Sequence, residues 1–227
     1  MDHERMTGPV LAETAEPSRA ALLVIDMQND DCRPQGKWAS LGSVEMIQTV
    51  ISNLQHLLPL ARDRGIRVIW LRNVWRRGIG YRSLPPSYLR FLLFKCGFHP
   101  GDRLVEEGSW GAELIPALVM QPQDIEVIKT RSSGFIGTDL DLFLRSNGFQ
   151  TLLIAGVATQ ACVESTVRSA VDRDYRIVIL RDCVGAYKSD LHEASLQVMR
   201  SFAEVVSMDD VLAEWDRGKR QTERREP

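Results

Sequence analysis

The chain has 227 residues, of which 44% are hydrophobic and 26% charged, and its formal net charge is -2. This composition is that of an ordinary globular domain, long enough to bury a sizeable core. The near balance of charge excludes the basic surface that a nucleic-acid partner needs, and no run approaches the roughly 18 apolar residues of a membrane span. We therefore expect neither nucleic acid nor membrane as a partner.

Both ends of the chain are polar. Residues 1–18 contain acidic residues and no continuous apolar stretch, unlike a signal peptide, and residues 216–227 are densely charged. We expect a flexible tail at each end of a single domain spanning residues 19–215. The cysteines form no CxxC pair and have no metal-finger spacing, which favours reduced thiols and a cytoplasmic protein.

Short apolar runs alternate with longer amphipathic runs along this domain. The expected strands are residues 21–26, 67–72, 124–129, 151–156, 176–181 and 203–207, and the expected helices are 43–65, 137–148, 159–175 and 189–202. Strands that are almost continuously apolar are covered on both faces, whereas the helices repeat apolar residues every three or four positions. The alternation predicts βαβ units and a three-layer α/β/α, Rossmann-like fold with a mainly parallel sheet.

Residues 75–110 interrupt this alternation directly after the second expected strand. The segment is rich in Gly, Pro, Arg and aromatic residues. Long excursions at strand ends commonly form binding loops or lids, and a contact between subunits is an equal alternative. Its "RGIGYR" lacks the strand-to-helix phosphate fingerprint, so we expect no nucleotide cofactor.

Three chemically active residues follow strands of the expected sheet. The first strand ends at Asp26, the third at Lys129, and the fourth leads through "GVATQA" to Cys162 at the start of a helix. Taken singly, each has a structural reading as a turn cap, a solvated lysine or a core cysteine. Ligands of open α/β sheets bind at the carboxyl ends of the strands, so we expect the three side chains to converge there. A helix start and an ammonium group would favour a thiolate nucleophile, with the carboxylate as proton acceptor.

Three motifs in register resemble those of the isochorismatase-like cysteine hydrolases: "ALLVIDMQND", "VIKTRSSGF" and "IAGVATQACVESTVRSA". The resemblance covers residues 20–212 and implies that Asp26, Lys129 and Cys162 form a catalytic triad. It also implies a six-stranded parallel sheet of order 3-2-1-4-5-6 and a homodimer or homotetramer.

The resemblance further implies a non-proline cis peptide between Val157 and Ala158, and an oxyanion hole made by the N–H groups of Ala158 and Cys162. In the implied mechanism, Asp26 takes the thiol proton and Cys162 attacks a carbonyl carbon to form a thioester. Asp26 then protonates the departing ammonia or amine, and water hydrolyses the thioester.

The second strand is followed by "WLRNVWRRGIGY", with neither Asp nor His, whereas nicotinamidases of this superfamily carry an Asp-x-His metal pattern there. The four histidines are scattered along the chain. We therefore expect no metal and no other cofactor, and nicotinamidase activity is disfavoured.

The cysteine in "GVATQACV" favours hydrolysis of a C–N bond over cleavage of a vinyl ether, because isochorismatases typically have "GVYAH" there. "RNVW", "GSWGAELIP" and "KTRSSGFIGTDLD" look most like the ureidoacrylate, biuret and N-carbamoyl amidohydrolase branch. The leading hypothesis is a cysteine amidohydrolase acting on a small linear amide, ureide or carbamoyl compound. An isochorismatase-type vinyl-ether hydrolase and a non-catalytic scaffold member are the alternatives.

The candidates for substrate binding surround these motifs, and they are Gln28, Asn73, Trp75, Arg131 and Phe135. Asn73 offers an amide to a ureido group, and Trp75 and Phe135 offer flat apolar walls. Arg131 either binds a substrate carboxylate or forms a structural ion pair. Gln28 either orients Asp26 or shapes the turn that follows it. Each candidate also has a structural reading, and for Arg131 and Phe135 that reading is favoured.

Overall fold

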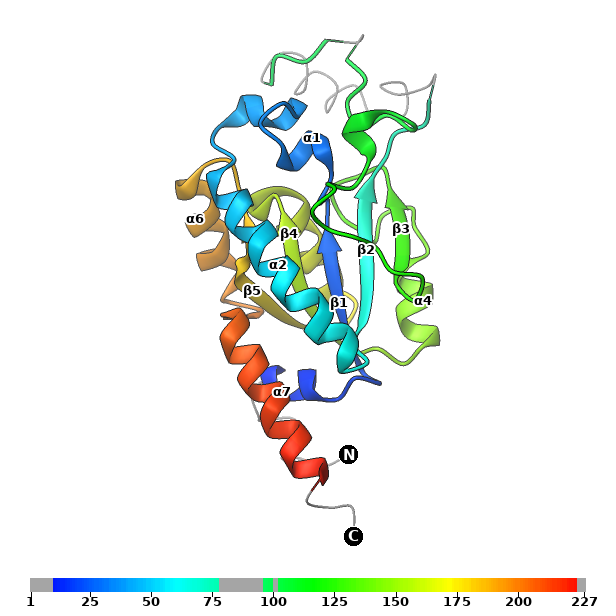
Figure 1. Ribbon diagram of the computed structural model, residues 1–227, viewed down its shortest axis with the longest axis vertical. Helices are drawn as coiled ribbons and strands as arrows, with labels where there is room; N and C mark the ends of the chain where they lie inside the picture. The colour runs from blue at the N-terminus through cyan, green and yellow to red at the C-terminus, as the bar shows by residue number, and fades with distance from the viewer. Residues whose placement is uncertain (1–9, 78–95, 100–101, 224–227) are drawn as a thin grey trace.

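A sheet of six parallel strands forms the centre of the protein (Figure 1). The structure is a computed structural model that describes residues 10–77, 96–99 and 102–223. The strands are β1 (Ala20–Ile25), β2 (Arg67–Asn73), β3 (Ile125–Lys129), β4 (Thr151–Val157), β5 (Arg176–Gly185) and β6 (Glu204–Val206). Their order, β3-β2-β1-β4-β5-β6, confirms the expected α/β fold and topology.

Helices cover both faces of the sheet and enclose two cores. On one face lie α2 (Glu45–Asp63) and α7 (Met208–Glu223), and on the other lie α4 (Leu140–Ser146), α5 (Glu164–Val171) and α6 (Ser189–Met199). Alternate residues of β1 pack into the two cores and all six are fully buried, which explains the unbroken apolar run. None of the helices in the described ranges is both long and apolar enough to cross a membrane.

The ends of the domain differ from the expected tails. Residues Val10–Ala15 form a 3-10 helix, η2, and the carbonyl of Thr14 accepts a hydrogen bond of 3.0 Å from the indole of Trp215. Helix α7, where no helix was expected, runs from Met208 to Glu223 and so extends into the expected C-terminal tail. The reason is packing, because buried Val211 and Trp215 on α7 belong to the core that η2 also contacts. Residues 1–9 lie outside the described ranges.

Short helices lie beyond the carboxyl ends of the strands, at the top of Figure 1. They are α1 (Asn29–Cys32), η3 (Lys37–Leu41) and η5 (Trp110–Ala112). The described part of the 75–110 insertion forms a small third core against η3, consisting of Trp75, Cys96, Phe98, Leu104 and Val105. Residues 78–95 and 100–101, the rest of that predicted loop, lie outside the described ranges.

Candidate active site

Asp26, Lys129 and Cys162 meet at the carboxyl edge of the sheet. The Lys129 ammonium donates a hydrogen bond of 2.8 Å to Oδ2 of Asp26, and its Nζ lies 3.4 Å from Sγ of Cys162. It also donates to the carbonyl of Arg131 at 3.2 Å. Lys129 and Asp26 are 0% and 1% exposed, whereas Cys162 is partly exposed. The convergence expected from the strand ends is therefore present.

The backbone around the site has unusual local conformations. Asp26 has a φ of 51°, a left-handed conformation that aspartate tolerates better than most residues, while its N–H donates to the Leu71 carbonyl at 2.8 Å. Gly156 has a φ of 115°, and a Cβ there would lie 2.1 Å from the carbonyl oxygen of Ile25. Only glycine therefore lets β4 lie this close to β1. The peptide bond between Val157 and Ala158 is cis, as the resemblance implied.

Cys162 lies in a single π-helical turn, η6 (Thr159–Val163), which leads directly into α5. Burial raises the pKa of its thiol, the negative charge of Asp26 raises it further, and Lys129 only partly opposes them. Burial also lowers the pKa of Lys129, but Asp26 and Cys162 outweigh that effect and the pKa is raised. These effects favour a thiol beside an ammonium–carboxylate pair, whereas the helix start by itself favours the thiolate.

Gln28 is fully buried and its side-chain amide is engaged by backbone groups. Its Nε2 donates to the carbonyls of Asn73 and Ala112, both at 2.9 Å, and its Oε1 accepts from the Asn73 N–H at 2.7 Å. The amide joins the turn after β1 to the end of β2 and to η5. Asn73 is 8% exposed, and its Oδ1 has no hydrogen-bond partner among the described residues. Of these two candidates, Asn73 keeps an acceptor for a ligand.

Trp75 and Phe135 lie in hydrophobic cores. Trp75 is 2% exposed within the third core, and its main-chain N–H donates to the Val105 carbonyl at 2.9 Å. Phe135 packs in the core beneath α4 and α5, with its ring centroid 5.8 Å from that of Tyr175 and 5.1 Å from the Arg173 guanidinium. Core packing accounts for both side chains.

Arg131 follows Lys129 at the end of β3. Its guanidinium donates to the carbonyl of its neighbour Thr130 at 2.7 Å, and its own carbonyl holds the Lys129 ammonium. Asp141, one acidic residue within reach of this segment in sequence, instead accepts hydrogen bonds from Arg145 and Tyr175. The main-chain contact with Lys129 is the role that the structure shows for Arg131.

Two carboxylates beside the site were missed by the sequence reading. Asp30 is 3% exposed, and its oxygens accept from the N–H groups of Val105 at 2.8 Å and Lys37 at 3.2 Å. Asp31 is 8% exposed, and its Oδ2 has no hydrogen-bond partner among the described residues. The signal was a second and third aspartate directly after a fully buried strand, where polar residues accumulate at ligand sites.

No group of three or more His, Cys, Asp or Glu side chains that could hold a metal ion occurs within the described ranges. His192 is buried, and its Nδ1 lies 2.9 Å from the hydroxyl of Thr159. That contact ties α6 to the turn that carries Cys162.

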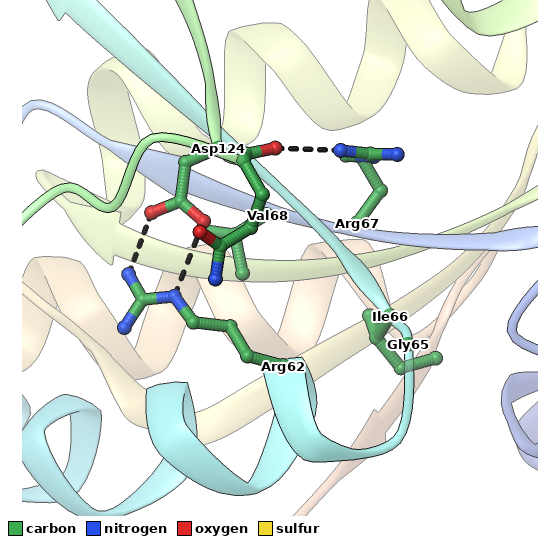
Figure 2. A pocket seen from close by; sticks show the side chains of 7 residues that line it. Arg62, Gly65, Ile66, Arg67, Val68 and Asp124 are labelled. Atoms are coloured by element: carbon green, nitrogen blue, oxygen red, sulfur yellow. Dashed lines mark hydrogen bonds and ion pairs between the residues drawn. The ribbon is translucent and has the colours of Figure 1, made fainter.

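A pocket at the other end of the sheet has a structural explanation. Figure 2 shows Arg62 reaching Asp124 through two hydrogen bonds, of 3.1 and 2.6 Å. The indole of Trp70 donates to the same carboxylate at 2.9 Å. This pocket lies where β2 and β3 begin, opposite the ends that carry Asp26 and Lys129, and Arg62 and Asp124 form an ion pair in it.

Comparison with known proteins shows which family the chain resembles in sequence and fold. An isochorismatase family protein from Desulfovibrio vulgaris is 30% identical, with a TM-score of 0.73, 86% of this chain covered and 98% of that one. A cysteine hydrolase from Pseudomonas syringae pv. phaseolicola is 27% identical, with a TM-score of 0.76 and coverages of 89% and 95%. A pyrazinamidase of Pyrococcus horikoshii, solved in complex with zinc, is 27% identical, with a TM-score of 0.67 and coverages of 84% and 99%. Residues 20–210 match the isochorismatase domain, and the chain belongs to that family of hydrolases.

Proposed function

We propose that this protein is a cysteine amidohydrolase that cleaves a C–N bond of a small linear amide, ureide or carbamoyl compound through a thioester. The observation that carries the proposal is the position of the Lys129 ammonium, 2.8 Å from Asp26 Oδ2 and 3.4 Å from Cys162 Sγ. A thiol, a carboxylate and a fixed cation in this arrangement supply a nucleophile, a base and a charge that stabilises their ionised forms.

The first half of the reaction forms the thioester. Asp26 accepts the Cys162 thiol proton as the sulfur attacks the carbonyl carbon, and the carbonyl π electrons move onto oxygen. The N–H groups of Ala158 and Cys162 are the proposed donors to that oxyanion. As the C–N bond breaks, the nitrogen takes the proton back from Asp26 and leaves as ammonia or an amine.

The second half releases the acid and restores the thiol. Asp26 takes a proton from water, whose oxygen attacks the thioester carbonyl carbon. The C–S bond then breaks, and the leaving sulfur recovers its proton from Asp26. In the resting site Asp26 and Cys162 raise the pKa of Lys129 despite its burial, which favours the ammonium form.

The relatives support hydrolysis without fixing the substrate. One is named as a cysteine hydrolase and another as a pyrazinamidase bound to zinc. The motifs "RNVW" and "KTRSSGFIGTDLD", together with the free Oδ1 acceptor of Asn73, favour the ureide and carbamoyl branch for this chain. We propose that it needs no metal or other cofactor. We also propose that it forms a homodimer or homotetramer, and size-exclusion chromatography with light scattering measures which of the two is present.

Ammonia release from a panel of small amides tests the proposal. The panel contains biuret, N-carbamoyl amino acids, a ureidoacrylate-like acid, nicotinamide and simple aliphatic amides, with Cys162→Ala in parallel. Turnover by the wild type alone supports the proposal. Turnover that survives in the variant contradicts it and favours acid-driven cleavage of the vinyl-ether type. Retained binding with no turnover of any substrate favours the scaffold alternative.

A further inference from the structure

Asp31 is a buried carboxyl group that the mechanism above does not use. It lies in α1, five residues after Asp26, and the hydroxyl of Tyr187 donates to its main-chain carbonyl at 2.9 Å. That bond fixes the backbone and leaves the carboxyl group unengaged. Oδ2 is completely buried and receives no hydrogen bond from any described residue, in a side chain that is 8% exposed overall.

The electrostatics of the site show which charges Asp31 faces. Burial raises the pKa of Asp31 well above its usual range, the negative charges of Asp26 and Asp30 raise it further, and Lys129 opposes them. In turn, Asp31 contributes to the raised pKa of the Cys162 thiol. The chain agrees with this, since Asp31 lies in α1 and the thiol of the adjacent Cys32 is 3.8 Å from the Asp26 carbonyl oxygen.

The two neighbouring carboxyl groups each have donors. Oδ2 of Asp26 is held by Lys129 at 2.8 Å, and the oxygens of Asp30 accept two backbone N–H groups. No described residue donates to Oδ2 of Asp31. A buried carboxyl without a donor is costly, so its retention beside a nucleophile points to a donor supplied by the ligand.

Since Lys129 is already paired with Asp26, two carboxyl groups share one fixed cation at this edge of the sheet. Resting on the proposed amidohydrolase activity, we infer that Asp31 is a specificity-determining residue that binds a cationic amino group carried by the amide substrate. Among small linear amides, the site then selects those bearing an ammonium group close to the reacting carbonyl. Substrates with a carboxylate in that position are disfavoured by like charge.

Three small amides test the effect of substrate charge. Glycinamide is cationic at neutral pH, propionamide has the same number of heavy atoms and is neutral, and the slightly larger malonamate is anionic. The wild type is expected to turn over glycinamide with a kcat/KM at least about tenfold above that of propionamide, with malonamate lowest. Asp31→Asn keeps the shape but cannot ionise against the ammonium group of the substrate, so the glycinamide-to-propionamide ratio falls at least about tenfold. Asp209→Asn, which removes an exposed carboxylate on α7, leaves the ratio unchanged.

Binding provides a readout that does not depend on turnover. By calorimetry, Cys162→Ala binds glycinamide more tightly than propionamide, and adding Asp31→Asn removes the difference. Equal affinities, or a preference for malonamate, overturn the assignment of Asp31 even where Cys162-dependent hydrolysis is found. Hydrolysis that survives in Cys162→Ala counts against the proposed function and leaves this binding test standing.

The melting temperature separates a functional from a structural carboxyl. A group whose burial opposes its charge destabilises the fold at neutral pH, so Asp31→Asn is expected to melt at or above the wild-type temperature. A variant that melts several degrees lower, or does not fold, identifies Asp31 as structural and overturns the inference.

Discussion

The side chain of Gln28 and the backbone of Asn73 form a closed pair of hydrogen bonds, with Nε2 donating to the carbonyl at 2.9 Å and Oε1 accepting from the N–H at 2.7 Å. Beyond the end of β1, the Gln28 side chain thus makes the two hydrogen bonds to β2 that the backbone of a neighbouring strand would make. The pair holds the end of β2 beside Asp26, and the second N–H of Gln28 reaches the Ala112 carbonyl in η5.

Gln28→Leu is expected to lower the free energy of unfolding by at least about 2 kcal/mol. It leaves three buried backbone groups without a hydrogen-bond partner, the N–H and carbonyl of Asn73 and the carbonyl of Ala112, and each such loss costs roughly 1–3 kcal/mol. Urea denaturation measures the change. Gln55→Leu removes an exposed amide that donates to the Ala117 carbonyl at 3.2 Å and should cost less than about 0.5 kcal/mol. A stable Gln28→Leu variant with only a raised KM would instead assign Gln28 to substrate binding.

Asp26→Asn is expected to lower the pKa of Cys162 while abolishing hydrolysis. After burial, the charge of Asp26 is the largest contribution that raises the thiol pKa, and its removal leaves Lys129 to stabilise the thiolate. Alkylation of Cys162 by iodoacetamide at neutral pH, followed by peptide mapping, should therefore be faster in Asp26→Asn than in the wild type.

Lys129→Met is the opposing variant. It removes a positive charge that lowers the thiol pKa of Cys162, so alkylation should be slower than in the wild type. If both variants react like the wild type, the charges of Asp26 and Lys129 do not control the thiol, and the proposed division of roles is wrong.

Gly111 lies against the carboxylate of Asp30, where a Cβ would be 2.0 Å from Oδ2. Gly111→Ala is expected to cost about 1–3 kcal/mol through overpacking and to loosen η5 from α1. In an Asp30→Ala background the same substitution should cost almost nothing, since the clash is gone. A double-mutant cycle measures this coupling, and additive effects would show that the two groups do not meet.

His192 makes stability depend on pH. Burial lowers its pKa from 6.5, opposed by the charge of Glu193. The unfolded chain therefore binds a proton at a higher pH than the folded one, and stability that is complete above about pH 6.5 falls as the pH drops below it. His192→Asn should flatten this fall in chemical denaturation, whereas His56→Asn, on an exposed position, should not. Equal pH profiles for the two variants would show that the buried His192 does not cause the loss of stability at low pH.

The sheet and the meeting of Asp26, Lys129 and Cys162 could be predicted because continuous apolar strands impose a parallel sheet whose carboxyl ends share one edge. The protonation state of Cys162 could not, since it depends on burial and on the distance to Asp26. The burial of Trp75 could not be predicted either, because it depends on contacts with residues far along the chain. Its partners, Phe98 and Val105, lie more than twenty residues further along an irregular segment without periodicity. Helix α7 was not predicted, because its buried anchor Trp215 lies within a charged stretch of the sequence.

The pairing of β3 with β2 aligns Lys129 with Asn73. Side chains alternate between the two faces along a strand, so a slip of one residue would turn Lys129 away and bring Ile128, now 42% exposed, into its place. Among the described strands, β3 lies at the edge of the sheet and pairs with β2 alone, so this register depends on a single ladder. A one-residue deletion in the connection before β3 can thus leave a folded protein whose thiol and carboxylate have lost their shared cation.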